Sequence, residues 1–168
     1  MLRKPLLTLV LALLLTSNGG PAAATEPKDL PRPTDYVSDL AHVLSDRAVN
    51  EVDEVCAQLD HSTADTQIAV VTIPTIDGAD VAEYAKALAN TWKVGKKESN
   101  RGILVLLAIN DHKWRIAISR GLETSFTDSE AASIGKKMTP RLRAKDFDGA
   151  VILAVRGIEQ VLAGHKKP

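Results

Sequence analysis

The sequence predicts an α/β fold, a three-layer αβα sandwich in which a small mixed β-sheet is flanked by helices. A short run rich in β-branched residues at 66–73 and a continuous apolar run at 103–109 alternate with longer segments whose apolar residues recur at helical spacing. A strand, a helix and a second strand of these lengths form a right-handed βαβ unit with parallel strands. Further helices then cover both faces of the sheet.

The first 24 residues have the pattern of a secretory signal peptide. Arg3 and Lys4 precede an apolar run from Leu6 to Leu15, and small residues for cleavage follow at 22–24. The run is about 10 residues long, whereas a membrane-spanning helix needs roughly 20. We therefore expect export, to the periplasm or as a secreted protein, and no membrane span after cleavage.

The rest of the chain divides into a linker, one domain and a tail. Three prolines within residues 25–35 prevent regular hydrogen bonding, so this stretch is predicted to be a Pro-rich linker. Residues 36–164 form the predicted domain, and residues 165–168 form a short polar tail. The 144 residues that follow a leader of 24 match the usual size of one domain.

The charge balance excludes one class of function. Two of the 21 Lys and Arg residues lie in the leader, so 19 remain against 21 Asp and Glu, a net charge of −2. Such a chain has no basic field to attract nucleic acid, and we expect no nucleic-acid partner.

The first half of the domain is predicted to be a helix followed by a strand. Ser45 is a typical helix cap, and the apolar positions after it keep helical spacing to about His61. Cys56 lies on that apolar face, so we expect a buried structural thiol; an intermolecular bridge or a reactive site is the alternative. Residues 66–73 then form an interior strand that ends at Pro74.

The second half continues the alternation and adds a hairpin. Helical spacing of apolar residues predicts a helix at about 80–92. Residues 103–109 form a buried strand, residues 110–112 a tight turn, and residues 113–118 alternate polar and apolar as an antiparallel partner strand. The last two helices are predicted at 128–143 and 147–162.

Strand direction assigns the polar loops to two ends of the sheet. Asp77, Asp80 and Asp111 follow the carboxyl ends of the parallel strands, which is where ligands of open α/β sheets usually bind. Glu123 and Asp128 follow the hairpin and are expected at the opposite end. Asp111 also suits a simple turn former.

Grouped carboxylates in an exported protein suggest a divalent cation, of which calcium is the first candidate because it prefers oxygen ligands. The alternatives stay open. Thr127 to Glu130 matches a T-x-x-E capping box in which Asp128 favours the positive end of the helix dipole. Glu123 is equally consistent with a solvated loop charge.

The sequence contains no motif for a zinc site, a nucleophilic serine or a nucleotide-binding site. The four histidines lack zinc spacing, and no nucleophile elbow, phosphate-binding P-loop or dinucleotide fingerprint occurs. The sequence therefore leaves the catalytic residues unknown, and with them whether the protein is an enzyme.

Four segments together resemble the TPM domain family. They are YVSDLAHVLS, TQIAVVTI, EYAKALANTWKVGKKESNRGILVLLA and RGLETSFTD, in this order between residues 36 and 128. The resemblance covers about residues 36–162. It implies an αβα sandwich, an exported or membrane-facing location, cation binding, and an acid phosphatase activity suggested for some plant members.

The same resemblance points to Asp39. This residue matches the first acidic position of the family's Asp-Asp-Ala-Gly segment, whereas Leu40 replaces the second acid and His42 the glycine. Ser119 stands where bacterial members usually have glycine. Asp39 therefore joins Glu123 and Asp128 as a candidate metal ligand, although simple topology leaves open at which end of the sheet it lies.

Two functions follow as hypotheses. The first is a soluble exported accessory or interaction module that binds a cation and engages membrane or exported proteins. The second is a weak metal-assisted phosphomonoesterase, in which a cation polarises the phosphoryl group and an aspartate is nucleophile or base. We expect a monomer, because the core between helices and sheet accounts for every apolar stripe.

Overall fold

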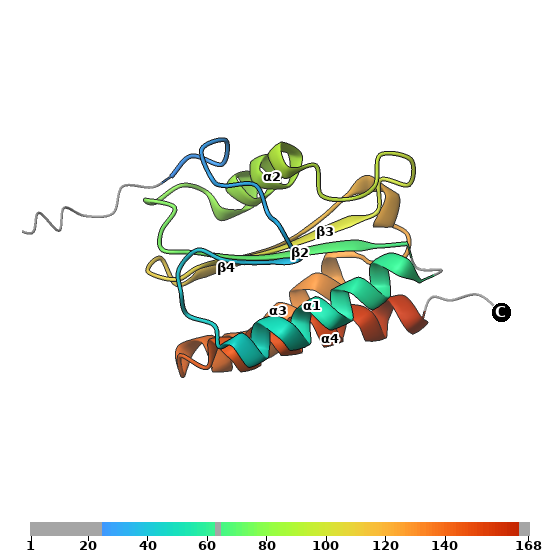
Figure 1. Cartoon of the computed structure of the whole chain (residues 1–168). Coiled ribbons are helices and arrows are strands. Elements are labelled where there is room, and N and C mark those ends of the chain that lie inside the picture. The colour runs from blue at the N-terminus through green and yellow to red at the C-terminus, as the bar shows by residue number, and fades with distance from the viewer. Residues whose placement is uncertain (1–24, 63–64, 165–168) are drawn as a thin grey trace, which may run out of the picture.

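A four-stranded mixed sheet forms the middle layer of the protein (Figure 1). A computed structural model describes residues 25–62 and 65–164. The strands lie in the order β1-β2-β3-β4, with the first three parallel and the last antiparallel. Their bounds are β1 Val37–Asp39, β2 Gln67–Ile73, β3 Gly102–Ala108 and β4 Lys113–Ile118.

The helices complete a three-layer αβα sandwich, as predicted. Helix α2 covers one face of the sheet, and α1, α3 and α4 cover the other (Figure 1). Their bounds are α1 Asp46–His61, α2 Val81–Trp92, α3 Asp128–Arg143 and α4 Phe147–Gly164, with a short 3-10 helix, η1, at Arg120–Leu122.

The central strands are buried because both of their faces are covered. Every residue of β3 is buried, and all but the first residue of β2 are too. This explains their continuous apolar sequence, which is typical of parallel strands between two helical layers. Cys56 of α1 is fully buried in the core below the sheet, and burial raises the pKa of its thiol to about 12. The prediction of a buried structural thiol is confirmed.

The helix starts follow the expected capping chemistry. Ser45 accepts a hydrogen bond from the backbone N–H of Ala48, and Thr127 forms a reciprocal capping box with Glu130. Ser45 is also tied to α4, because its backbone N–H and its hydroxyl both donate to Asp148, at 2.9 and 2.7 Å. This contact holds the start of α1 against the start of α4.

Strand β1, like the short 3-10 helix η1, was not predicted from the sequence. It has three residues, all half-buried, and therefore shows neither alternation nor an apolar run. Its register against β2 pairs Asp39 with Thr72, which places Asp39 at the carboxyl ends of the parallel strands. The sequence alone left open at which end of the sheet Asp39 lies, and this register determines it.

The described part of the Pro-rich segment lies near α2 (Figure 1). Leu30 packs against the apolar cluster on the α2 face of the sheet, and the Tyr84 hydroxyl donates to the carbonyl oxygen of Thr25. The predicted signal peptide and polar tail lie outside the described residues. No helix within residues 25–62 and 65–164 is both long and apolar enough to cross a membrane.

Candidate functional site: an apolar pocket with a basic rim

Asp39 anchors the loop between β1 and α1. Its two carboxylate oxygens accept from the backbone N–H groups of Val43, at 3.2 Å, and Leu44, at 2.9 Å. The hydroxyl of the fully buried Thr72 also donates to Asp39, and its oxygen accepts from the backbone N–H of Ala41 at 3.2 Å. Both oxygens of this carboxylate are thus engaged by protein groups.

Glu123 and Asp128 lie beyond the carboxyl end of β4. Glu123 ends the 3-10 helix and is exposed. Asp128 is the first residue of α3, and its side chain is 86% exposed with Arg115 at 3.7 Å. An ion pair so open to solvent adds little stability.

The three predicted metal ligands do not converge on one point. Asp39 lies at the carboxyl end of β1, whereas Glu123 follows a helix whose Gly121 N–H donates to Asn100, just before β3 begins. Within the described residues, no group of three or more His, Cys, Asp or Glu side chains is placed to hold a metal ion. A cation at Glu123 and Asp128 stays a prediction.

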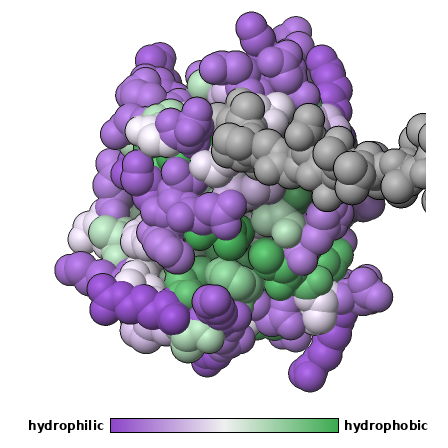
Figure 2. All heavy atoms as spheres, turned by 90° about the vertical axis from the view of Figure 1, so that its left-hand side faces the viewer, coloured by the Kyte–Doolittle hydropathy of each residue, from purple (hydrophilic) through white to green (hydrophobic). Residues whose placement is uncertain are grey.

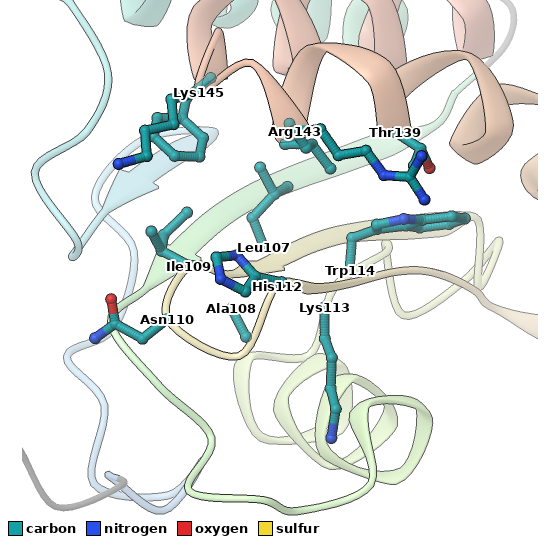
Figure 3. A pocket seen from close by; sticks show the side chains of 12 residues that line it. Leu107, Ala108, Ile109, Asn110, His112, Lys113, Trp114, Thr139, Arg143 and Lys145 are labelled. Atoms are coloured by element: carbon teal, nitrogen blue, oxygen red, sulfur yellow. The ribbon is translucent and has the colours of Figure 1, made fainter.

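A pocket of about 660 Å³ opens at the same end of the sheet as Asp39 (Figure 3). Residues of the β3–β4 hairpin form one side, and residues of the end of α3, the α3–α4 turn and the start of α4 form the other. Figure 2 shows apolar side chains gathered at this end of the molecule, with hydrophilic ones around them. The lining residues are Leu107, Ala108, Ile109, Asn110, His112, Lys113, Trp114, Thr139, Leu142, Arg143, Lys145 and Phe147.

The interior of the pocket is apolar because its two sides come from faces directed at the core. Leu107 and Trp114 are register partners on β3 and β4, and both belong to the core cluster beneath the sheet. The Trp114 ring fits where Gly135 of α3 has no side chain, since a Cβ there would lie 1.7 Å from its Cη2 atom. Gly135 therefore lets α3 approach the sheet closely enough to form this wall.

Basic side chains surround the mouth of the pocket. His112 comes from the hairpin turn, and Arg143 and Lys145 come from the end of α3 and the turn after it (Figure 3). His112 and Lys145 have φ values of 53° and 59°, in the left-handed region that non-glycine residues seldom adopt. Lys113 instead points to the α2 side, where its amine donates to the Ala79 carbonyl at 3.3 Å.

The acidic residues nearest in sequence to this rim are engaged elsewhere. Asp146 accepts from the Gly149 N–H at 2.9 Å and pairs with Arg141 at 2.5 Å; this hydrogen bond and the Arg141 guanidinium lower the pKa of the Asp146 carboxyl. Asp111 accepts from the Ile76 N–H at 2.9 Å. Burial raises the pKa of Asp111, but hydrogen bonds from Ile76, Thr75 and Gly78 outweigh it, so the net pKa shift is downward.

The lowered pKa of Asp146 predicts an acid-sensitive α3–α4 turn. The ionised carboxylate stabilises the fold above its unfolded pKa of about 4, and this stabilisation disappears as pH falls through the lower folded value. Asp146→Asn keeps a capping side chain but has no charge. We expect its melting temperature to lie below that of the wild type at pH 7 and to meet it near pH 2.

The matched control for this prediction is Glu54→Gln, at an exposed position of α1. Its melting temperature should follow the wild type at every pH. A gap between wild type and Asp146→Asn that persists unchanged at pH 2 would show that the charge of Asp146 contributes nothing to this turn.

Sequence reasoning placed Asp111 correctly at this end of the sheet but missed the pocket itself. The two sides of the pocket are 25 positions apart in the sequence, from Trp114 to Thr139, and no short motif joins them. One signal was present: Trp114 is a large aromatic residue on an edge strand, and Gly135 interrupts the middle of a helix. Together they indicate a close contact between the two elements.

The comparisons agree with this fold. A family model described as the TPM domain matches residues 37–161. A search of curated proteins finds no match. Among solved structures, the N-terminal domain of a protein from P. gingivalis is 26% identical with a TM-score of 0.76, covering 84% of this chain and 93% of that one.

Two more distant structures share the fold. The N-terminal domain of the cg2496 protein from Corynebacterium glutamicum is 14% identical with a TM-score of 0.63, covering 83% of this chain and 88% of that one. The BA42 protein from the psychrophilic bacterium Bizionia argentinensis is 15% identical with a TM-score of 0.61, covering 72% and 82%. At such identities the likeness concerns the fold alone.

Proposed function

Because this chain belongs to the TPM domain family, we propose that it is an accessory binding module whose site is the pocket between the β3–β4 hairpin and the α3–α4 turn. Its ligand is a small molecule with an apolar part. The single observation that carries this proposal is the apolar pocket at the carboxyl ends of the parallel strands.

The size, lining and position of the pocket each support binding of a small molecule. Its volume of about 660 Å³ lies within the range of roughly 300–1,000 Å³ that is usual for ligand sites. Ligand sites are mostly apolar with a few polar groups, and Trp114, Leu142 and Phe147 provide apolar walls of this kind here. Ligands of open α/β sheets also bind beyond the carboxyl ends of the strands.

Binding is better supported than phosphoester hydrolysis. The alternative enzyme needs a carboxylate with a free oxygen for the nucleophile or base, whereas Asp39 already accepts hydrogen bonds from Thr72, Val43 and Leu44. Among the described residues that line the pocket, none is Asp or Glu. Thr139 is held as well, because its hydroxyl donates to the Gly135 carbonyl at 2.9 Å.

The proposal includes the setting expected from the sequence. The leader-like pattern of residues 1–24 supports a module that acts in the periplasm or outside the cell. Membrane or exported proteins as partners, a monomeric state and a bound divalent cation remain predictions beside it.

Filling the pocket tests the proposal. The neutral probe 1-decanol should change the emission of Trp114, read in a Trp92→Phe background so that one tryptophan reports. Thr139→Phe places a ring inside the pocket and should abolish the change. Lys136→Phe, at an exposed position of the same helix outside the pocket lining, should leave it intact. Equal responses of both variants, or none in the parent, would refute the site.

A further inference from the structure

We propose that the ligand is an amphipathic anion, with an apolar body inside the pocket and one oxyanion headgroup, carboxylate or phosphate, held at the mouth by Arg143 and Lys145. This inference rests on the proposed function and adds the ligand's charge and orientation. The apolar walls do not determine the charge or the orientation of the ligand, and the inference therefore comes from the charged side chains at the rim.

The charge at the mouth is uncompensated. Arg143 and Lys145 are exposed, and the residues that the structure describes give neither of them an ion-pair partner. His112 adds a third nitrogen-bearing side chain from the hairpin turn. With no carboxylate in the lining, an anion meets attraction from the α3 side of the mouth and no repulsion from the walls.

The neighbouring carboxylates are prevented from neutralising this charge. Asp146 follows Lys145 directly, yet it pairs with Arg141 at 2.5 Å and caps the Gly149 N–H. Asp148 accepts two hydrogen bonds from Ser45. The two acids that follow the bases in this turn are therefore both engaged by other protein groups, and Arg143 and Lys145 are left at the opening.

The headgroup and the body have separate places in the pocket. In Figure 3 Arg143 extends toward Trp114 and Thr139, while Lys145 lies on the other side of the opening. Arginine binds carboxylate or phosphate oxygens with two parallel N–H donors, and lysine adds a point charge. Leu107 and Leu142 also line the pocket, and these uncharged side chains suit the apolar body of the ligand.

The geometry also limits how much charge the ligand carries. Two cations and one histidine form a local patch on a chain that is neutral overall, with 21 basic and 21 acidic residues. Such a patch suits one headgroup, whereas a polyanion requires an extended basic surface.

A four-probe titration tests the inference, again with Trp114 as reporter in Trp92→Phe. The probes are decanoate, decyl phosphate, 1-decanol and inorganic phosphate, all at low ionic strength. Decanoate and decyl phosphate are kept below their micelle concentrations, and 1-decanol is kept below its solubility limit. We expect decanoate and decyl phosphate to bind about two- to fivefold more tightly than decanol, the gain of a partly exposed ion pair. The tighter binder of the two, decanoate or decyl phosphate, identifies the preferred headgroup as carboxylate or phosphate. The gain should shrink in high salt.

Charge-removing variants assign the effect to the rim. Arg143→Gln and Lys145→Gln should each weaken decanoate about two- to fivefold and leave decanol unchanged. Lys136→Gln, an exposed base of α3 outside the lining, is the matched control and should change neither probe.

The unfavourable outcomes are distinct. Decanol binding as tightly as decanoate would overturn the anion preference and leave the binding module standing. Inorganic phosphate binding as tightly as decyl phosphate would overturn the apolar body of the ligand. No response to any of the four probes would overturn both this inference and the proposed function.

Discussion

Gly135→Ala is expected to lower the free energy of unfolding by about 1–3 kcal/mol, the usual effect of overpacking a core. The added Cβ would lie 1.7 Å from Cη2 of Trp114 and 2.3 Å from its Cζ2 and Cζ3 atoms, so the ring or the helix must move. Alanine is intrinsically better than glycine in a helix by up to about 1 kcal/mol, which is too little to compensate. Urea unfolding measures the difference.

Two further variants isolate the cause. Gly164→Ala lies at the end of α4 with no atom within 4 Å of the added Cβ, and it should leave stability unchanged or slightly higher. In the Trp114→Phe background the smaller ring should tolerate Gly135→Ala much better. A Gly135→Ala protein as stable as the wild type would contradict the close packing that forms this pocket wall.

Asp39→Ala is expected to destabilise the fold by about 2–4 kcal/mol, because it orphans two backbone N–H groups and the buried Thr72 hydroxyl at once. The loss should be the same in calcium and in chelator, since it comes from hydrogen bonds inside the protein. Thermal and urea unfolding under both conditions provide the measurement.

Thr72→Val provides the partner variant for Asp39. It removes the hydroxyl from the other side of the same network, so the double variant should lose less than the sum of the two single losses. If Asp39→Ala matched the wild type in chelator and fell behind only in calcium, Asp39 would be a cation ligand and its role as loop anchor would be wrong.

Much of the fold could be predicted from the sequence because local pattern and tertiary burial agree. The buried strands β2 and β3 have continuous apolar runs, and Ser45 and Thr127 cap helices where expected. The parallel order of β2 and β3 follows from the single helix between them.

The rest required tertiary contacts. Strand β1 exists because three half-buried residues pair with β2, and nothing in Val37–Asp39 marks them as a strand. The sequence identified Asp39 as acidic but not as the acceptor for Thr72, 33 residues away. The pocket as a whole could not be predicted for the same reason, since tertiary packing and not sequence spacing places Trp114 and Phe147 in its lining.

The sequence and its family resemblance predicted the fold and three candidate carboxylates, and the structure places Asp39 apart from Glu123 and Asp128. Asp39 is engaged in the loop after β1, whereas Asp128 lies within the capping box formed by Thr127 and Glu130. That Glu123 and Asp128 hold a cation stays a prediction, and measurements with calcium test it.

Chemical-shift mapping of the isotope-labelled protein with decanoate tests the central claim most directly. The account predicts that amide shifts concentrate at the two walls of the pocket, residues 107–114 and 139–147. It also predicts that the Arg143→Gln variant shows smaller shifts at the same ligand concentration. Shifts centred on Glu123 and Asp128, or spread evenly over the surface, would contradict the assignment of this pocket as the binding site.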